Sequence, residues 1–238
     1  MGSTFVKVLI LGSGPDAVEA RNFKSNVFDK IIAINNAWKV RKDWDFCIFP
    51  NDFPKEKRPK INLRQQLITF NEYVPIQNKF GGFVYAGGTM AFTTGYWALG
   101  KLKPALIAYL GCDMIYKGNK THFYGKGTAD PLRDDPTLKN LLSKSARFEV
   151  IANSNNCSVF NLSKNKESNL IFRRLGISEL FEPIDLREVE NKKASEALRL
   201  EEALGYFVED GKYWKHFKNF DPKEISRLDN LWSEAIMK

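Results

Sequence analysis

Cysteine and histidine are scarce in this chain of 238 residues, which contains three cysteines and two histidines. Cys47, Cys112 and Cys157 each lie in an apolar or strand-like context, so we expect buried, reduced thiols and neither a disulfide framework nor a zinc site. Long apolar runs are missing too, since none approaches the roughly 18 to 20 residues of a membrane span. The amino terminus also lacks the pattern of a signal peptide. These absences predict a soluble, cytoplasmic protein.

The strongest pattern lies in the first forty residues. An apolar run, 6–11, meets the glycine-rich sequence Gly12–Pro15, and a second apolar run, 31–34, ends at Asn35. This order predicts a strand, a phosphate-binding loop, a helix begun by Pro15 and a second strand. The loop fits G-x-G-x-x-G/A, but Asn35 stands where the ribose of NAD requires an acidic residue, so NAD is disfavoured. A purely structural turn is the alternative interpretation.

The rest of the chain alternates between apolar strands and helices. We expect strands at 45–49, 105–110 and 158–162, with a further candidate at 69–74. Helices are expected over Met90–Leu102, which Thr89 caps and Pro104 ends, over 137–153 and over 168–175. The alternation predicts an α/β fold of the Rossmann-like, doubly wound type, with a mostly parallel sheet and helices on both faces.

The carboxyl-terminal part differs in character. Residues 194–207 and 225–237 have helical spacing with mixed charge, which indicates amphipathic helices. We therefore expect a nucleotide-binding domain over residues 1–184 and a helical extension over residues 185–238 that packs on it. The apolar stripes of these helices pack on the sheet or on a second subunit, so a homo-oligomer is one expectation.

Charge is distributed unevenly. The net charge is +8, and residues 1–184 carry 26 Lys and Arg against 16 Asp and Glu. The densest cluster is Lys55–Arg64, which we call the basic segment. It suits a phosphorylated substrate or an anionic membrane surface, and a solvated loop is the plainer interpretation. Nucleic-acid binding is not expected, because no aromatic residues are interleaved with the cluster.

Polar residues follow the predicted strands at their carboxyl ends, where ligands bind in open α/β sheets. Gly12–Asp16, Asn35, Asn51 and Asp113 are therefore expected at one crevice. The long polar loop 116–128 follows Asp113 and is predicted to be a lid. His122 in this loop is a candidate general base, and an ordinary surface histidine is the alternative. His216 is interpreted as structural.

These motifs, taken in order, resemble those of the bacterial sialyltransferases of glycosyltransferase family 42 over about residues 5–175. The Gly-x-Gly-Pro start, the asparagines after the second and third strands, and a late Gly-x-Asp followed by a histidine loop carry the resemblance. Two hydroxyl residues of the family are missing, at Ala86-Gly87-Gly88 and at Leu110–Asp113, and Thr89 stands one position later. The resemblance implies that His122 is the catalytic base and that the donor is bound by Gly12, Ser13, Gly14, Pro15, Asn35, Asn51, Gly87, Gly88, Thr89, Gly111, Asp113, Tyr116 and Tyr124.

The implied activity is that of a glycosyltransferase. It would transfer a sugar from a CMP-activated donor to a hydroxyl of a glycan or another acceptor by inverting displacement, without a metal or cofactor. Cytoplasmic location is expected, with peripheral contact between the basic segment and the inner face of the membrane.

Two other hypotheses stay open. A magnesium-dependent pterin or nucleotide pyrophosphokinase-like enzyme would use Asp113 with Asp130 or Asp134, since a related family with a similar Gly-x-Gly-Pro start includes such an enzyme. A non-catalytic nucleotide-binding module would use the same crevice.

Overall fold

A single parallel sheet forms the centre of the molecule, whose computed structural model describes residues 5–127, 133–182 and 184–236. Its strands, in sheet order, are β4 (Gln66–Ile68), β3 (Phe46–Ile48), β2 (Lys30–Ile34), β1 (Lys7–Leu11), β5 (Leu106–Leu110), β6 (Ser158–Asn161) and β7 (Arg173–Arg174). Each neighbouring pair is parallel. The predicted α/β, Rossmann-like doubly wound fold is confirmed.

The helices fall into two kinds. The α-helices are α1 (Phe70–Asn78), α2 (Met90–Leu102), α3 (Leu141–Ser154), α4 (Asn191–Leu204) and α5 (Pro222–Ala235). Short 3₁₀ helices span Pro15–Asn22, Asn35–Lys39, Lys55–Lys57, Pro136–Leu138, Ile177–Phe181 and Tyr213–Asn219. No helix in the described ranges combines the length and the apolar character that crossing a bilayer requires.

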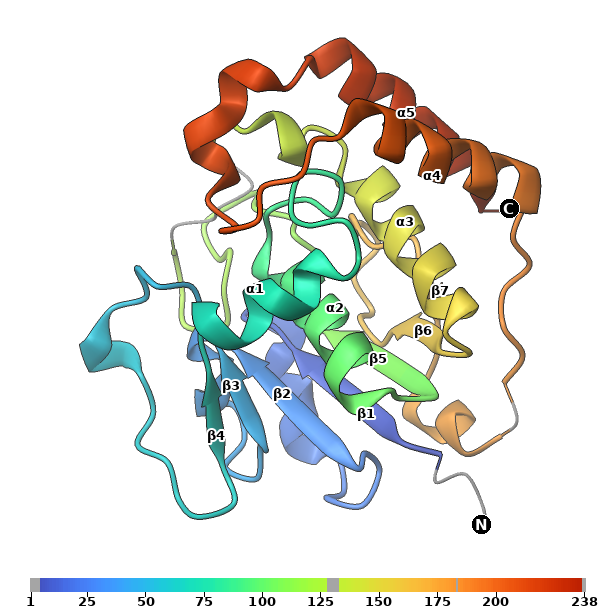
Figure 1. Cartoon of the computed structure of the whole chain (residues 1–238). Helices are drawn as coiled ribbons and strands as arrows, with labels where there is room; N and C mark the ends of the chain where they lie inside the picture. The colour runs from blue at the N-terminus through green and yellow to red at the C-terminus, as the bar shows by residue number, and fades with distance from the viewer. Residues whose placement is uncertain (1–4, 128–132, 183, 237–238) are drawn as a thin grey trace.

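The two faces of the sheet are covered differently. Along β1, Val8 and Ile10 face one core, whereas Leu9 and Leu11 face the other, as the two-residue period of a strand requires. The α-helices α1, α2 and α3 lie on the first face (Figure 1). On the second face, Ala17 and Ala20 of the 3₁₀ helix after β1 supply part of the core. The predicted helix at Pro15 is therefore a 3₁₀ helix.

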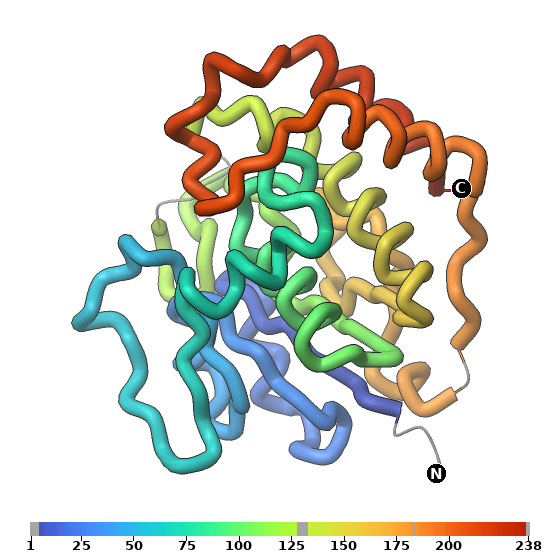
Figure 2. The backbone as a smooth tube through the Cα atoms, in the orientation of Figure 1, coloured from blue at the N-terminus to red at the C-terminus, as the bar shows by residue number. Residues whose placement is uncertain are grey.

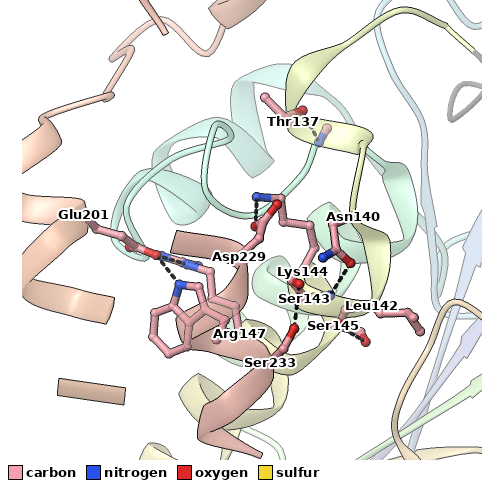
Figure 3. Close-up of polar contacts among 12 residues, drawn as sticks. Thr137, Asn140, Leu142, Ser143, Lys144, Ser145, Arg147, Glu201, Asp229 and Ser233 are labelled. Atoms are coloured by element: carbon pink, nitrogen blue, oxygen red, sulfur yellow. Dashed lines mark hydrogen bonds and ion pairs between the residues drawn. The ribbon is translucent and has the colours of Figure 1, made fainter. Parts of the chain in front are cut away.

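The carboxyl-terminal helices α4 and α5 join the first face through buried polar contacts with α3 (Figure 3). The guanidinium of Arg147 donates to both carboxylate oxygens of Glu201 at 2.6 and 2.7 Å, and the indole of Trp232 donates to Glu201 at 2.8 Å. Lys144 forms a second buried ion pair with Asp229, at 2.6 Å. Helices α4 and α5 thus share a core with the first face of the sheet.

Three sequence predictions of secondary structure differ from the structure. The candidate strand at 69–74 is wrong: Thr69 caps α1 and residues 70–74 form its first part, because Thr69 and Glu72 form a capping box that starts a helix there. Residues 168–175 are not helical; the Ser168 hydroxyl binds the backbone N–H of Leu170, and the segment ends in β7. The helix expected over 137–153 begins at Leu141, where Asn140 caps it after a 3₁₀ turn.

Candidate functional site

The order of strands reverses between β1 and β5, so their carboxyl ends form the topological switch point where ligands bind in such sheets. The loops that follow the two strands are in direct backbone contact. Gly12 N–H donates to the Leu110 carbonyl and Gly14 N–H donates to the Gly111 carbonyl, both at 2.8 Å. A Cβ atom on Gly12 would lie 2.2 Å from the Gly111 oxygen. Close packing of the two loops therefore requires these glycines, and their N–H groups are not available to a phosphate.

A cavity of about 810 Å³ opens at this switch point. It is lined by the loops after β1, β2, β3, β5 and β6 and by the start of α2. Eleven of the residues singled out from the sequence line it: Gly12, Ser13, Gly14, Pro15, Asn35, Thr89, Gly111, Asp113, Tyr116, His122 and Tyr124. The carboxyl-end rule thus brings residues from distant parts of the chain to one site.

Three of the singled-out residues lie outside the cavity lining. Asn51 is exposed, and its carbonyl accepts a hydrogen bond from Arg58, while the neighbouring Pro50 and Asp52 line the cavity. Gly88 donates its N–H to the Thr137 hydroxyl at 3.3 Å. Gly87 has a φ of +78° and packs against Lys144. The two glycines shape the turn before α2.

The amino terminus of α2 is a ready anion site at the cavity. The Thr89 hydroxyl caps the helix by accepting from Phe92 N–H at 3.3 Å. Met90 and Ala91, the first two helical residues, line the cavity. The first N–H groups of a helix have no partner inside the helix and attract negative charge. A phosphate is therefore better served at α2 than at the glycine loop.

Asn35 and Asn36, at the carboxyl end of β2, carry unused hydrogen-bonding capacity. Their Oδ1 atoms are buried and have no hydrogen-bond partner, and both residues line the cavity. Asn35 also has a φ of +52°, a left-handed conformation that asparagine tolerates better than most residues. A buried acceptor without a partner costs roughly 1 to 3 kcal/mol. A ligand with N–H or O–H donors would recover this cost.

His122 is held tightly in the loop after β5. Its ring lies between those of Tyr116 and Tyr124, with centroid distances of 6.0 and 5.0 Å. Its Nδ1 is 2.9 Å from the Thr121 hydroxyl, and Gly127 N–H donates to that same hydroxyl oxygen. The residue is 8% exposed, and burial lowers the pKa of the imidazole. The neutral ring, which a general base requires, is therefore favoured at neutral pH.

The loop that carries His122 rests directly on the glycine loop. Phe123 N–H donates to the Ser13 carbonyl at 3.0 Å, and a β-bridge joins His122 to Gly125. The predicted lid therefore contacts the first loop of the site. Thr128 and Asp130 lie outside the described residues.

Asp113 is engaged in a network that shapes the cavity wall. Its carboxylate accepts hydrogen bonds from Asn161, Ser163 and Asn165, which orders the segment after β6. Burial also raises the pKa of the nearby Asp16 carboxyl, and the charge of Asp113 adds to this shift. Asp113 thus positions a loop, with its oxygens already committed to protein donors.

Other reactive groups give little support to metal or thiol chemistry. The described residues hold no group of three or more His, Cys, Asp or Glu side chains arranged for a metal ion. The one D-x-D sequence at a strand, Asp43-Trp44-Asp45, precedes β3 and so lies at the opposite edge of the sheet, where Asp45 pairs with Lys30. Burial raises the pKa of the Cys112 thiol well above its usual value, so a thiolate nucleophile is disfavoured.

Lysines dominate the charged groups of the cavity wall. Lys117 pairs with Glu167 at 2.8 Å. Four other lysines of the lining have no acidic partner within the described residues: Lys57, Lys120, Lys126 and Lys166. Their positive charge favours an anionic ligand.

Sequence reasoning missed Asn36, Thr121 and the segment Asn165–Glu167 as parts of this site. Asn36 follows Asn35 directly, so its position after β2 was the available signal. The segment after β6 carried no motif. No protein-family model, curated protein or solved structure gives a significant match to this chain.

Proposed function

We propose that this protein is a glycosyltransferase, similar to the sialyltransferases, that transfers a sugar from a CMP-activated donor to an acceptor hydroxyl. The observation that carries the proposal is the placement of His122. A buried imidazole with a lowered pKa lies in a lysine-rich cavity at the switch point of the sheet. This combination suits a reaction in which a hydroxyl loses a proton while an anionic nucleotide leaves.

The donor binds through two sets of groups in this proposal. Its phosphate lies at the amino terminus of α2, next to Thr89, with lysines of the wall neutralising the remaining charge. Its ribose hydroxyls donate to the amide oxygens of Asn35 and Asn36, because the end of the second strand meets the ribose in Rossmann-like folds. The glycine loop supplies close packing, with Ser13 facing the donor.

His122 acts as the base on the acceptor. In the tautomer with hydrogen on Nδ1, the ring donates to the Thr121 hydroxyl, and the Nε2 lone pair is available. A bond forms between the acceptor oxygen and the anomeric carbon while the bond from that carbon to the CMP phosphate oxygen breaks. The acceptor proton passes to Nε2, and CMP leaves with the electron pair. Tyr116 and Tyr124 hold the ring plane during this step.

The pyrophosphokinase hypothesis has less support in the site. It needs carboxylates for magnesium, but the Asp113 oxygens accept three protein hydrogen bonds. Asp134 is 99% exposed and lies 3.9 Å from Lys139. Asp130 lies outside the described residues. We also propose a cytoplasmic location for the reaction and a mechanism without a metal.

The test is CMP release from CMP-activated sugars, measured with a panel of hydroxyl acceptors in the presence of EDTA. We expect turnover by the wild-type protein, and a loss of about a hundredfold or more in His122→Ala, with CMP binding retained. His216→Ala, at the other histidine of the chain, is the matched control and keeps full activity.

Two outcomes contradict the proposal. Transfer from ATP that requires magnesium would support the pyrophosphokinase hypothesis instead. CMP binding with no release from any donor, and with no difference between wild type and His122→Ala, would support a non-catalytic module.

A further inference from the structure

The connection between β3 and β4 carries apolar side chains where a soluble surface is usually polar. It protrudes from the edge of the sheet beside β4 (Figures 1 and 2). Leu63 is fully exposed and Ile61 is 51% exposed, although both lie in the middle of the basic segment. Two neighbouring aliphatic side chains in water are unfavourable unless something covers them.

Hydrogen bonds hold this region in a defined conformation. The Asn62 side chain accepts from Arg64 N–H at 2.9 Å. The buried Gln65 side chain donates to the carbonyls of Lys42 and Trp44. The Trp38 indole donates to the Lys57 carbonyl at 3.0 Å. The segment is therefore anchored to the domain on both sides of Ile61 and Leu63, which stay outside the core.

The charges around the two aliphatic side chains are mostly positive. Lys55, Lys57, Lys60 and Arg64 are exposed, and no ion pair involving them occurs among the described residues. Glu56 is the one acidic residue between Lys55 and Arg64. Exposed aliphatic groups within unpaired positive charge match the chemistry of an anionic membrane surface, whose headgroups attract the charges while its interface takes up the aliphatic groups.

We propose that the basic segment docks the protein on membranes that contain anionic lipids, with Ile61 and Leu63 entering the interfacial region. Binding is reversible, because two aliphatic side chains and four basic residues give a modest affinity. Pro54 and Lys57 also line the cavity, so docking brings the site close to the membrane surface. The proposal does not depend on the reaction assigned to the cavity.

The test is flotation of the full-length protein with vesicles of phosphatidylcholine and phosphatidylglycerol, compared with vesicles of phosphatidylcholine alone. We expect binding to the anionic vesicles only, and release at high salt because salt screens the attraction. Lys60→Ala/Arg64→Ala is expected to lower the partition coefficient about thirtyfold, which corresponds to ~1 kcal/mol for each basic residue. Ile61→Ser/Leu63→Ser is expected to lower it about tenfold or more.

Matched controls separate docking from general effects of charge and hydrophobicity. Lys101→Ala/Lys223→Ala removes two exposed lysines elsewhere, and Leu198→Ser removes an exposed leucine of α4. Both are expected to bind vesicles like wild type, and so is His122→Ala. All substituted side chains of the basic segment are exposed, so unchanged melting temperatures are expected.

Equal binding to neutral vesicles, or no vesicle binding at all, would overturn the proposal. Binding that survives in Ile61→Ser/Leu63→Ser without loss would also overturn it, because charge alone would then explain the attraction.

Discussion

The position of the His122 ring is open to a direct test, because a single added methyl group at Gly127 would displace it. Gly127 does not occupy the left-handed region, so alanine fits its backbone. A Cβ atom there would lie 2.7 Å from His122 Nδ1 and 2.8 Å from Cε1. Ordinary contact begins near 3.4 Å, so the ring has to move by about 0.7 Å or more. Tyr116 and Tyr124 flank the ring and restrict where it can go.

A displacement of this size is expected to reduce turnover strongly while leaving donor binding almost unchanged. Misplacement of a catalytic group by about 1 Å costs on the order of a hundredfold in rate. We therefore expect Gly127→Ala to lower kcat for CMP release by about this factor, with a similar KM for the donor. The assay is the initial rate of CMP release over a range of donor concentrations, together with the melting temperature.

Gly176→Ala is the matched control, because Gly176 also has a backbone that alanine can adopt and its Cβ would meet only the Glu179 side chain and the Ser178 hydroxyl. It is expected to leave kcat unchanged. Wild-type turnover by Gly127→Ala would refute the assignment of His122 as the base. So would equal loss in both variants, which would indicate a general effect on stability.

Three further predictions follow from buried groups. Burial lowers the pKa of His122 below its ordinary value of 6.5, so kcat/KM is expected to be level at neutral pH and to fall in acid with a midpoint below 6.5; because the folded state disfavours the charged ring, its stability contribution is present above pH 6.5 and is lost as the pH falls through the folded pKa, and an NMR titration of the ring that gives a raised pKa would contradict this. Asn36→Leu removes an acceptor without a partner, so we expect a gain of about 1 kcal/mol in the free energy of unfolding and about a tenfold loss in CMP affinity, measured by urea denaturation and calorimetry; unchanged affinity would remove Asn36 from the site. Arg147→Met leaves Glu201 as an unpaired buried charge and is expected to cost about 3 to 5 kcal/mol of unfolding free energy, and Arg147→Met/Glu201→Gln is expected to recover part of that loss; a double variant less stable than Arg147→Met would argue against the ion pair as the cause.

The fold could be predicted where local signals and burial agreed. Helix α2 has the predicted bounds, Met90–Leu102, because Thr89 caps it and the chain turns before Pro104. The apolar runs that became β1, β2 and β5 were equally clear, since central strands of a parallel sheet are buried on both faces. At 69–74 the apolar pattern was ambiguous, and the capping box of Thr69 with Glu72 decided for a helix.

The site was only partly predictable for a physical reason. The carboxyl-end rule gives the edge of the sheet where polar residues gather, and it located Asn35, Asp113 and the loop of His122. Hydrogen bonding within the protein cannot be read from a motif. The glycine loop looked like a phosphate site, but Gly12 and Gly14 use their N–H groups to hold the loop after β5. Asp113 looked free to bind a ligand, and three protein donors occupy it.

The central claim is that the cavity between β1 and β5 binds a cytidine nucleotide without a metal. The most direct measurement is the melting temperature of the protein in EDTA with CMP, CDP, UDP, GDP, ATP or NAD, repeated with magnesium. A ligand that binds only the folded state raises this temperature. We predict that CMP raises it selectively and equally with or without magnesium. A response to ATP that requires magnesium, or no response to any nucleotide, would contradict the account.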